Sequence, residues 1–410
     1  MSIGLTVDPT LLQPLSQRSD QSLHTVENST LARRGEVAEE KTISVGAVLE
    51  RFLADPTQDW SPRTRLAYET TSRFMISMIG ASTPIGHMTR AACREFLETL
   101  RFLPKNASRS FPDLTPKQAS DYARSTGYEN VISPSNANIY INKVCVVLNW
   151  AVREGYLERN HLKGLRLADP IARVDKRLPF SHLQLEAMFN APLFTGCQDD
   201  ELGYAKAGGK RPRGTRFWVI LIALYTGMRL NEICQLDTAD VRAFEGIACF
   251  SVSERSLVGT DDKHLKTRSS ERVVPIHPDL LSLGILDFVE QRNDAGHDKL
   301  FFDICAGQDG FRSTAFSKWF VLFLIHAKAR EPKTSFHSFR HLFRDALRQA
   351  KVSREIAMIL GGWGTGTKSG LDVADYYGKG FEISVLAEAI EKLSFDHINA
   401  LRALITSSKR

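Results

Sequence analysis

Imidazole and guanidinium groups recur at helical spacing in FHSFRHLFRDAL, residues 336–347. His337 and Arg340 are three positions apart, and His341 and Arg344 continue the same face. Residues at i, i+3 and i+4 point the same way from a helix, so these groups either form a solvated surface or converge on one target. Guanidinium groups bind phosphate through forked hydrogen bonds, so a shared target would be a phosphate.

The same stretch also carries an apolar seam. Its members are Phe336, Phe339, Phe343 and Leu347. A basic face beside such a seam belongs to a helix that docks on a core. We therefore expect His337 and Arg340 to lie at a buried margin, although a solvated face is the commoner outcome for charged helices.

Further motifs along the chain carry residue types that bind or attack phosphate. In chain order with HSFR, they are TGMRLNEI with Arg229, KTRSSERVVPI with Lys266, GGWG with Trp363, and DYYGKG with Tyr376 and Tyr377. Each motif alone is short enough to arise by chance. Their common chemistry and their order therefore carry the prediction.

Other kinds of active site are excluded by the sequence. YAKAGGKR misses the nucleotide-binding P-loop, because Tyr204 replaces its first glycine and Arg211 its final Ser or Thr. GGWGTG has Thr367 where a dinucleotide fingerprint needs its last glycine. Neither an HExxH motif nor a carboxylate cluster with metal-ligand spacing occurs. We expect no cofactor and no metal.

The motifs, in this order, resemble those of the tyrosine recombinases, also called the phage integrase family, over roughly residues 41–395. The resemblance implies a site-specific recombinase that cleaves and rejoins DNA through a 3′-phosphotyrosine intermediate. It also implies a helical core-binding domain that forms a C-shaped clamp around DNA with the catalytic domain. A phosphotyrosine bond conserves the ester linkage, which agrees with the missing ATP site.

The resemblance assigns Arg229 and Arg340 to the phosphate. Attack on a phosphodiester places charge on the nonbridging oxygens, and two guanidinium groups stabilise that charge. Glu232, three residues after Arg229, is expected to orient it. Arg229 as a surface arginine and Glu232 as a surface carboxylate are the alternatives.

Proton transfer is assigned in the same way. His337 would act as general base or hydrogen-bond partner of the tyrosine, unless it is a satisfied core histidine. Lys266 would be the general acid that protonates the departing 5′ oxygen. Lys263 is its competitor, and Lys266 is favoured because its motif runs directly into a predicted strand.

Trp363 stands where the family carries His or Trp, and its indole N–H would donate to the phosphate. Core packing is the alternative for this ring. Tyr377, which Gly378 follows, is the predicted nucleophile, and Tyr376 is its competitor. The interval from Trp363 to these tyrosines is longer than is usual in the family.

Apolar periodicity predicts a mainly α scaffold for these residues. Residues 41–165 are expected to form a four-helix-type core DNA-binding bundle. Its predicted helices lie within 43–52, 61–80, 89–103 and 133–157, with Ser61 and Pro62 starting the second, and Ile139, Val144, Val147, Leu148 and Ala151 sharing one side of the last. The polar segment between the third and fourth is expected to hold one short helix.

A linker at 166–177 is predicted to lead into the catalytic domain, 178–410. That domain is expected to be mainly helical, with Ser181 as a helix cap and a small antiparallel β-sheet from GIACFSVS and ERVVPI. GYAKAGGKRPRGTR is a basic loop that would either contact DNA phosphates or be solvated. The apolar stripe of EISVLAEAIEKLSFDHINALRALI would either dock on a neighbouring protomer, as in the family, or pack within its own chain.

Composition agrees with a DNA partner without requiring one. The 410 residues include 53 basic and 47 acidic side chains, a net charge of +6. Six scattered cysteines without a CxxC pair indicate a reducing compartment. Residues 1–40 are predicted to be a disordered tail. With neither a membrane span nor a signal peptide in the sequence, we expect a cytoplasmic, nucleoid-associated protein.

The sequence therefore predicts an integrase of a phage or other mobile element. The expected partners are double-stranded DNA attachment sites, a homo-tetramer on two duplexes, and accessory DNA-bending or directionality proteins. A type IB topoisomerase, which uses a nearly identical site, and a catalytically silent DNA-binding regulator are the alternatives.

Overall fold

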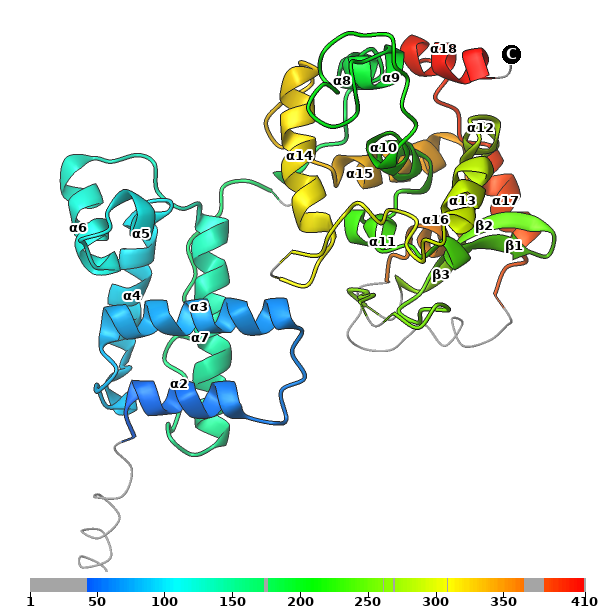
Figure 1. The fold of residues 1–410 in the computed structure, drawn as a ribbon. Coiled ribbons are helices and arrows are strands. Elements are labelled where there is room, and N and C mark those ends of the chain that lie inside the picture. The colour runs from blue at the N-terminus through cyan, green and yellow to red at the C-terminus, as the bar shows by residue number, and fades with distance from the viewer. Residues whose placement is uncertain are drawn as a thin grey trace, which may run out of the picture. The chain divides into compact units, whose positions relative to one another are not determined.

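The computed structural model describes residues 43–172, 176–260, 262–267, 270–307, 309–364 and 380–408. Residues 1–40, predicted as a tail, and the candidate nucleophiles Tyr376 and Tyr377 lie outside the described residues. The chain divides into two compact units, residues 1–169 and 170–410 (Figure 1). Within the described ranges, none of the helices is both long and apolar enough to cross a membrane.

The described part of the first unit is helical throughout. Its helices are α2 (Val45–Ala54), α3 (Pro62–Ile79), η1 (Ile85–His87), α4 (Arg90–Phe102), α5 (Ala107–Ser110), α6 (Pro116–Thr126) and α7 (Pro134–Arg153). The four predicted helices are present as α2, α3, α4 and α7, and α3 has Ser61 as its N-cap with Pro62 in the first turn. The polar segment holds α5 and α6 instead of one short helix, because Thr115 and Gln118 form a capping box for α6.

Helices α2 and α3 both cross α7, which carries much of the core of this unit (Figure 1). The predicted α7 stripe of Val144, Val147, Leu148 and Ala151 is buried. Ile139 was wrongly assigned to it and is 49% exposed. It precedes Val144 by five residues, which is about 140° away from it around a helix of 3.6 residues per turn.

The second unit is mainly helical with a small sheet, as predicted. Before the sheet come α8 (His182–Phe189), α9 (Pro192–Thr195), α10 (Thr215–Thr226), α11 (Leu230–Cys234) and η3 (Thr238–Asp240). After it come α12 (Pro278–Ser282), α13 (Ile285–Asp294), α14 (Ser313–His326), α15 (Ser338–Gln349), α16 (Arg354–Gly361), α17 (Ile383–Glu391) and α18 (Asn399–Ser408). Ser181 is the N-cap of α8, as predicted.

The sheet consists of β1 (Val241–Phe244), β2 (Ile247–Val252) and β3 (Arg272–Pro275), antiparallel and in that order. Strands β2 and β3 were predicted and β1 was not. A two-residue turn with positive φ at Glu245 and Gly246 joins β1 to β2, as hairpin twist requires. The longer connection from β2 to β3 carries Lys266.

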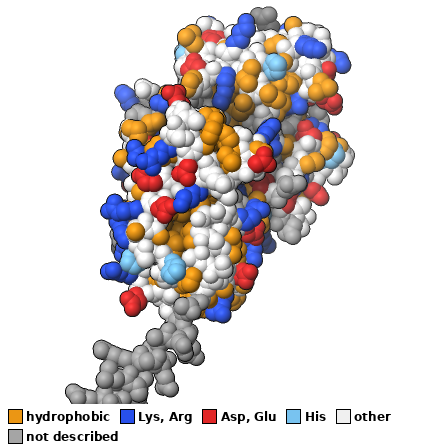
Figure 2. All heavy atoms as spheres, turned by 90° about the vertical axis from the view of Figure 1, so that its left-hand side faces the viewer, with side chains coloured by type: hydrophobic (Ala, Val, Ile, Leu, Met, Phe, Trp, Pro, Cys, Tyr) orange, Lys and Arg blue, Asp and Glu red, His pale blue; other side chains and the backbone are white. Residues whose placement is uncertain are grey.

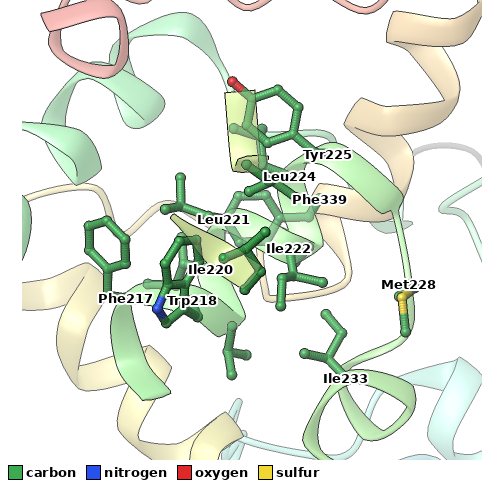
Figure 3. Close-up of a cluster of buried hydrophobic side chains, with 14 of the residues drawn as sticks. Phe217, Trp218, Ile220, Leu221, Ile222, Leu224, Tyr225, Met228, Ile233 and Phe339 are labelled. Atoms are coloured by element: carbon green, nitrogen blue, oxygen red, sulfur yellow. The ribbon is translucent and has the colours of Figure 1, made fainter. Parts of the chain in front are cut away.

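Helix α10 is the centre of the second unit. Every residue of its TRFWVILIALYT except the partly buried Arg216 is buried, and it is therefore surrounded by other elements (Figure 3). Helix α15 packs on α10 through the predicted apolar seam. All four seam residues are buried: Phe336, Phe339, Phe343 and Leu347. The seam therefore fixes which face of α15 carries His337 and Arg340.

The C-terminal helices pack within their own unit in this structure. Leu386 and Ile390 of α17 and Leu401 and Ile405 of α18 belong to the core that contains α10. Helix α17 contacts β3, and α18 contacts α8. The apolar stripe is thus buried intramolecularly, and its docking on a neighbouring protomer stays a prediction.

Two arginines of the basic loop before α10, GYAKAGGKRPRGTR, make contacts within the protein. Arg213 donates to the backbone oxygen of Leu283 and to Ser408 Oγ, both at 2.6 Å. Arg216 donates to the backbone oxygen of Asp200 and lies 5.1 Å from the Tyr204 ring centre. These two arginines hold the loop in place, and contact of the loop with DNA phosphates stays a prediction.

Candidate active site

Arg229 owes its position to an abrupt end of the central helix. Helix α10 ends at Gly227, which has φ +58°, and Arg229 becomes the N-cap of α11. A side chain at 227 would have its Cβ 2.5 Å from the Phe343 ring, so α15 approaches closely only because residue 227 is glycine. This turn brings Arg229 to the edge of the unit with a quarter of its side chain exposed.

Glu232 holds Arg229 in place, as predicted. Its carboxylate accepts from Arg229 Nη1 at 2.6 Å and from the Arg229 backbone N–H at 2.9 Å. It also accepts from Arg272 Nη2 at 2.9 Å. Burial alone would raise the pKa of Glu232, but the charge and hydrogen bond of Arg272 lower it below its usual value. Glu232 is therefore a buried anion that orients two arginines.

Arg272 is a member of the site that sequence reasoning missed. It begins β3, and its side chain is 3% exposed. Besides Glu232, it donates to the backbone oxygens of Leu360 at 2.9 Å and Ser270 at 2.7 Å. The available signal was a charged residue at the start of a predicted strand, in SSERVVPI.

Arg340 lies at the buried margin of α15, as the apolar seam predicted, and is 4% exposed. Its guanidinium donates to the backbone oxygens of Gly227 at 2.9 Å and Gly362 at 3.3 Å. It thereby joins the end of α10 to the turn after α16. Gly362 has φ +56°, and a Cβ there would lie 2.9 Å from the Arg272 guanidinium, so this turn also depends on glycine.

The site holds more positive charge than it neutralises. Burial, and then the charge of Arg229, lower the pKa of Arg340 to about 9, and Arg272 and Arg344 act in the same direction. Arg340 still carries its proton at neutral pH. Among the described residues, the guanidinium groups of Arg229, Arg272 and Arg340 therefore share the charge of one buried carboxylate, Glu232. Such an excess favours an anion, and forked donors suit a phosphate.

His337 is partly buried beside these arginines. Burial, followed by the charges of Arg177, His341, Arg340 and Arg229, lowers its pKa to about 4. Its ring meets that of His341 edge-on, with ring centres 5.1 Å apart. His337 is consequently a neutral imidazole at pH 7, with one ring nitrogen that can accept a hydrogen bond.

Trp363 lies over the arginines of α15. Its ring centre is 4.7 Å from the Arg340 guanidinium carbon and 5.0 Å from that of Arg344. A Cβ at Gly361 would overlap the indole, so the glycine makes room for it. The ring stabilises both cations through its π face and is part of the site as well as of the packing.

The two candidate lysines are in opposite environments. Lys263 is 1% exposed and donates to Asp240 at 2.6 and 2.9 Å. Lys266 is exposed on the connection between β2 and β3. Ser270 ties the far end of this connection to the site, because its Oγ accepts from Arg229 Nη1 at 2.9 Å. Of the two lysines, Lys266 alone can reach a ligand without breaking a buried ion pair.

The structure thus brings together Arg229, His337, Arg340 and Trp363 and adds Arg272. Lys266 lies on a connection tied to them. In the described part of the chain, no group of three or more His, Cys, Asp and Glu side chains is placed to hold a metal ion. The arrangement offers a partly buried cluster of guanidinium groups whose forked donors suit a phosphate, with a neutral imidazole beside it.

The arginine cluster lies where α11, which follows the central helix α10, meets β3, because Glu232 of α11 pairs with Arg272 of β3 at 2.9 Å. Residues 210–368 match the sequence model of the Phage integrase family. Residues 210–368 are therefore similar to the catalytic domain of this family, whose members are tyrosine recombinases that cleave and rejoin DNA. Among curated proteins, none matches the chain.

Solved integrases have a similar fold. The Tn1549 transposon integrase in complex with transposon right end DNA is 19% identical, with a TM-score of 0.51, over 84% of this chain and 98% of that one. Tn1549 integrase in complex with a circular intermediate DNA is 16% identical, with a TM-score of 0.53, over 89% of this chain and 99% of that one. A lambda integrase dimer bound to a COC′ core site is 14% identical, with a TM-score of 0.52, over 86% of this chain and 83% of that one.

Proposed function

We propose that this protein is a site-specific integrase of a phage or other mobile element, which cleaves DNA through a 3′-phosphotyrosine intermediate. The observation that carries the proposal is the guanidinium cluster around Glu232. Arg340 is more than 100 positions after Arg229 in the chain, yet it donates to Gly227 in the same turn that carries Arg229 and Glu232. Arg229, a quarter exposed, and a partly buried Trp363 leave the cluster open to a ligand.

The proposed reaction exchanges one ester for another. The Tyr377 oxygen forms a bond to phosphorus as the bond from phosphorus to the 5′ oxygen breaks. His337 accepts the phenolic proton, and the Lys266 ammonium donates a proton to the departing 5′ oxygen. Arg229 and Arg340 stabilise the charge on the nonbridging oxygens. A 5′ hydroxyl of another strand reverses the steps and releases Tyr377.

The proposed partner is duplex DNA carrying an attachment site. Similar integrases are seen on transposon end DNA and, as a dimer, on a lambda core site, which supports this choice. In Figure 2, Lys and Arg side chains are mixed with acidic and apolar ones on the face shown, so the charge of this face does not mark a DNA-binding surface. We assign DNA grip to residues 41–165 and chemistry to 178–410, with a tetramer assembling on two duplexes.

Exchange between two marked duplexes tests this function. Duplexes that carry the attachment site and different fluorophores should yield recombinant strands. Relaxation of a supercoiled plasmid without exchange would instead identify a topoisomerase. Specific binding with neither activity would identify a silent regulator.

A further inference from the structure

The connection from β2 to β3 holds Lys266 between two anchored points. On one side, Ser270 accepts from Arg229 and shares a hydrogen bond of 3.0 Å with Thr267. On the other side, three residues before Lys266, Lys263 is buried in a cluster of charges. The exposed Lys266 side chain is therefore positioned by a backbone that is held in place both before and after it.

The second anchor is a charge-balanced ion network. Lys263 pairs with Asp240 at 2.6 Å and Asp237 at 3.4 Å. Lys299 pairs with Asp237 at 2.7 Å and with Asp262 at 2.6 Å. Arg312 completes it by pairing with Asp262 at 2.8 Å. Three acidic and three basic side chains therefore neutralise one another, and Lys263, Lys299, Asp237 and Asp240 are buried.

The connection itself is hydrogen-bonded to this network. Ser256 Oγ donates to Asp237 at 2.7 Å, and Thr260 Oγ1 bonds to Ser256 at 3.0 Å. The backbone N–H of His264 donates to Gln235 Oε1 at 3.0 Å, and that of Leu265 donates to Glu254 Oε1 at 2.7 Å. The last two bonds hold the residues immediately before Lys266, and their acceptors lie beside the network in sequence, Gln235 two residues before Asp237 and Glu254 two residues before Ser256.

We propose that Lys263, together with Asp237 and Asp240, is a positioning group that holds Lys266 at the departing 5′ oxygen. This proposal rests on the proposed function. Buried ion pairs add little net stability compared with apolar packing, but they fix one arrangement when each charge has a specific partner. Lys263 is thus a residue that acts through Lys266 and does not itself touch DNA.

A bridging sulfur substrate separates positioning from general instability. A thiolate leaves without protonation, because a thiol pKa is about 8.5 in cysteine. General acid catalysis contributes about 10²- to 10⁴-fold. Lys263→Met should therefore slow single-turnover cleavage of ordinary DNA by about 10- to 100-fold and cleave 5′-phosphorothiolate DNA within about threefold of wild type.

Three further variants make the assignment specific. Ser256→Ala, a milder change that keeps the Lys263 amine, should show the same selective defect, as should Lys266→Ala. Lys263→Met combined with Lys266→Ala should be no slower than Lys266→Ala alone. Tyr225→Phe, which removes a bond of 2.8 Å to Asp279 elsewhere in this unit, is the matched control and should keep the wild-type ratio of the two rates.

Amide hydrogen exchange at His264 and Leu265 gives a readout without DNA. Exchange there should accelerate at least tenfold in Lys263→Met and Ser256→Ala, and stay unchanged in Tyr225→Phe. Unchanged exchange, or equal loss on both substrates by folded variants, would overturn the positioning role. A normal ratio in Lys266→Ala with a selective defect in Lys263→Met would make Lys263 the acid. Absence of cleavage by the wild type would refute the proposed function. Amide hydrogen exchange would still show whether Lys263 and Ser256 hold the backbone at His264 and Leu265 in place.

Discussion

Glu232→Gln should destabilise the catalytic domain, and a bound anion should stabilise this variant more than it stabilises the wild type. The carboxylate accepts three hydrogen bonds, from two groups of Arg229 and from Arg272. A glutamine of the same shape keeps one acceptor oxygen and turns an N–H₂ toward a guanidinium or a backbone N–H. Arg229, Arg272 and Arg340 then lose their only carboxylate neighbour within the cluster described above.

The magnitude follows from burial. Breaking a buried ion pair by removing one partner costs about 3–5 kcal/mol. Glutamine retains part of the hydrogen bonding, so we expect a loss of about 3 kcal/mol in the free energy of unfolding. For a domain of this size that loss lowers the midpoint of thermal unfolding by roughly 6–12 °C.

Thermal unfolding with and without sulfate or duplex DNA measures both effects. Either anion should raise the midpoint of Glu232→Gln more than that of the wild type, because it supplies the missing negative charge. Glu388→Gln, an exposed glutamate on α17, is the matched control and should leave the midpoint within about 1 °C of the wild type. A Glu232→Gln variant as stable as wild type, or one that anions do not selectively restore, would refute the reasoning.

Three further changes test the site. Arg340→Lys should cut the rate of covalent adduct formation by about 10²- to 10³-fold, because an ammonium cannot bind both the backbone oxygens and the phosphate; near-normal single-turnover rates would remove Arg340 from charge stabilisation. The His337 imidazole in DNA-free protein should titrate near pH 4 by NMR, with His337→Gln identifying the signal. Since this folded pKa lies below the unfolded value of about 6.5, stability should fall as pH drops from 6.5 toward 4, and a midpoint at or above 6.5 would contradict the burial of the ring. Gly227→Ala should lower the free energy of unfolding by about 2–4 kcal/mol in chemical denaturation, from the positive φ and the overlap with Phe343, and a neutral effect would show that the turn relaxes.

Local signals predicted much of the helical scaffold. Ser61 with Pro62, and Ser181 with Gln184, mark helix starts through contacts within a few residues, so sequence alone reveals them. The seam of α15 was likewise visible, because its period is that of the helix. Interactions of this short range do not depend on the rest of the fold.

Contacts distant in sequence could not be predicted in the same way. Strand β1 has only four residues, and its existence depends on pairing with β2. Arg272 enters the site because β3 lies beside Glu232, 40 positions earlier in the chain. Nothing near Lys263 in the sequence shows that Asp237 and Asp240 neutralise it. The preference for Lys266 over Lys263 came from motif context, and burial now supplies its physical reason.

The most direct test of the proposed chemistry is mass spectrometry of a covalent adduct on nicked suicide DNA. The substrate is built from the DNA that borders the gene, since an integrase commonly lies beside its own attachment site. The proposed mechanism predicts a 3′-phosphotyrosyl peptide at Tyr377, its loss in Tyr377→Phe with DNA affinity retained, and its persistence in Tyr376→Phe. An adduct at Tyr376 would move the nucleophile by one residue, and DNA binding without any adduct would contradict covalent catalysis by this protein.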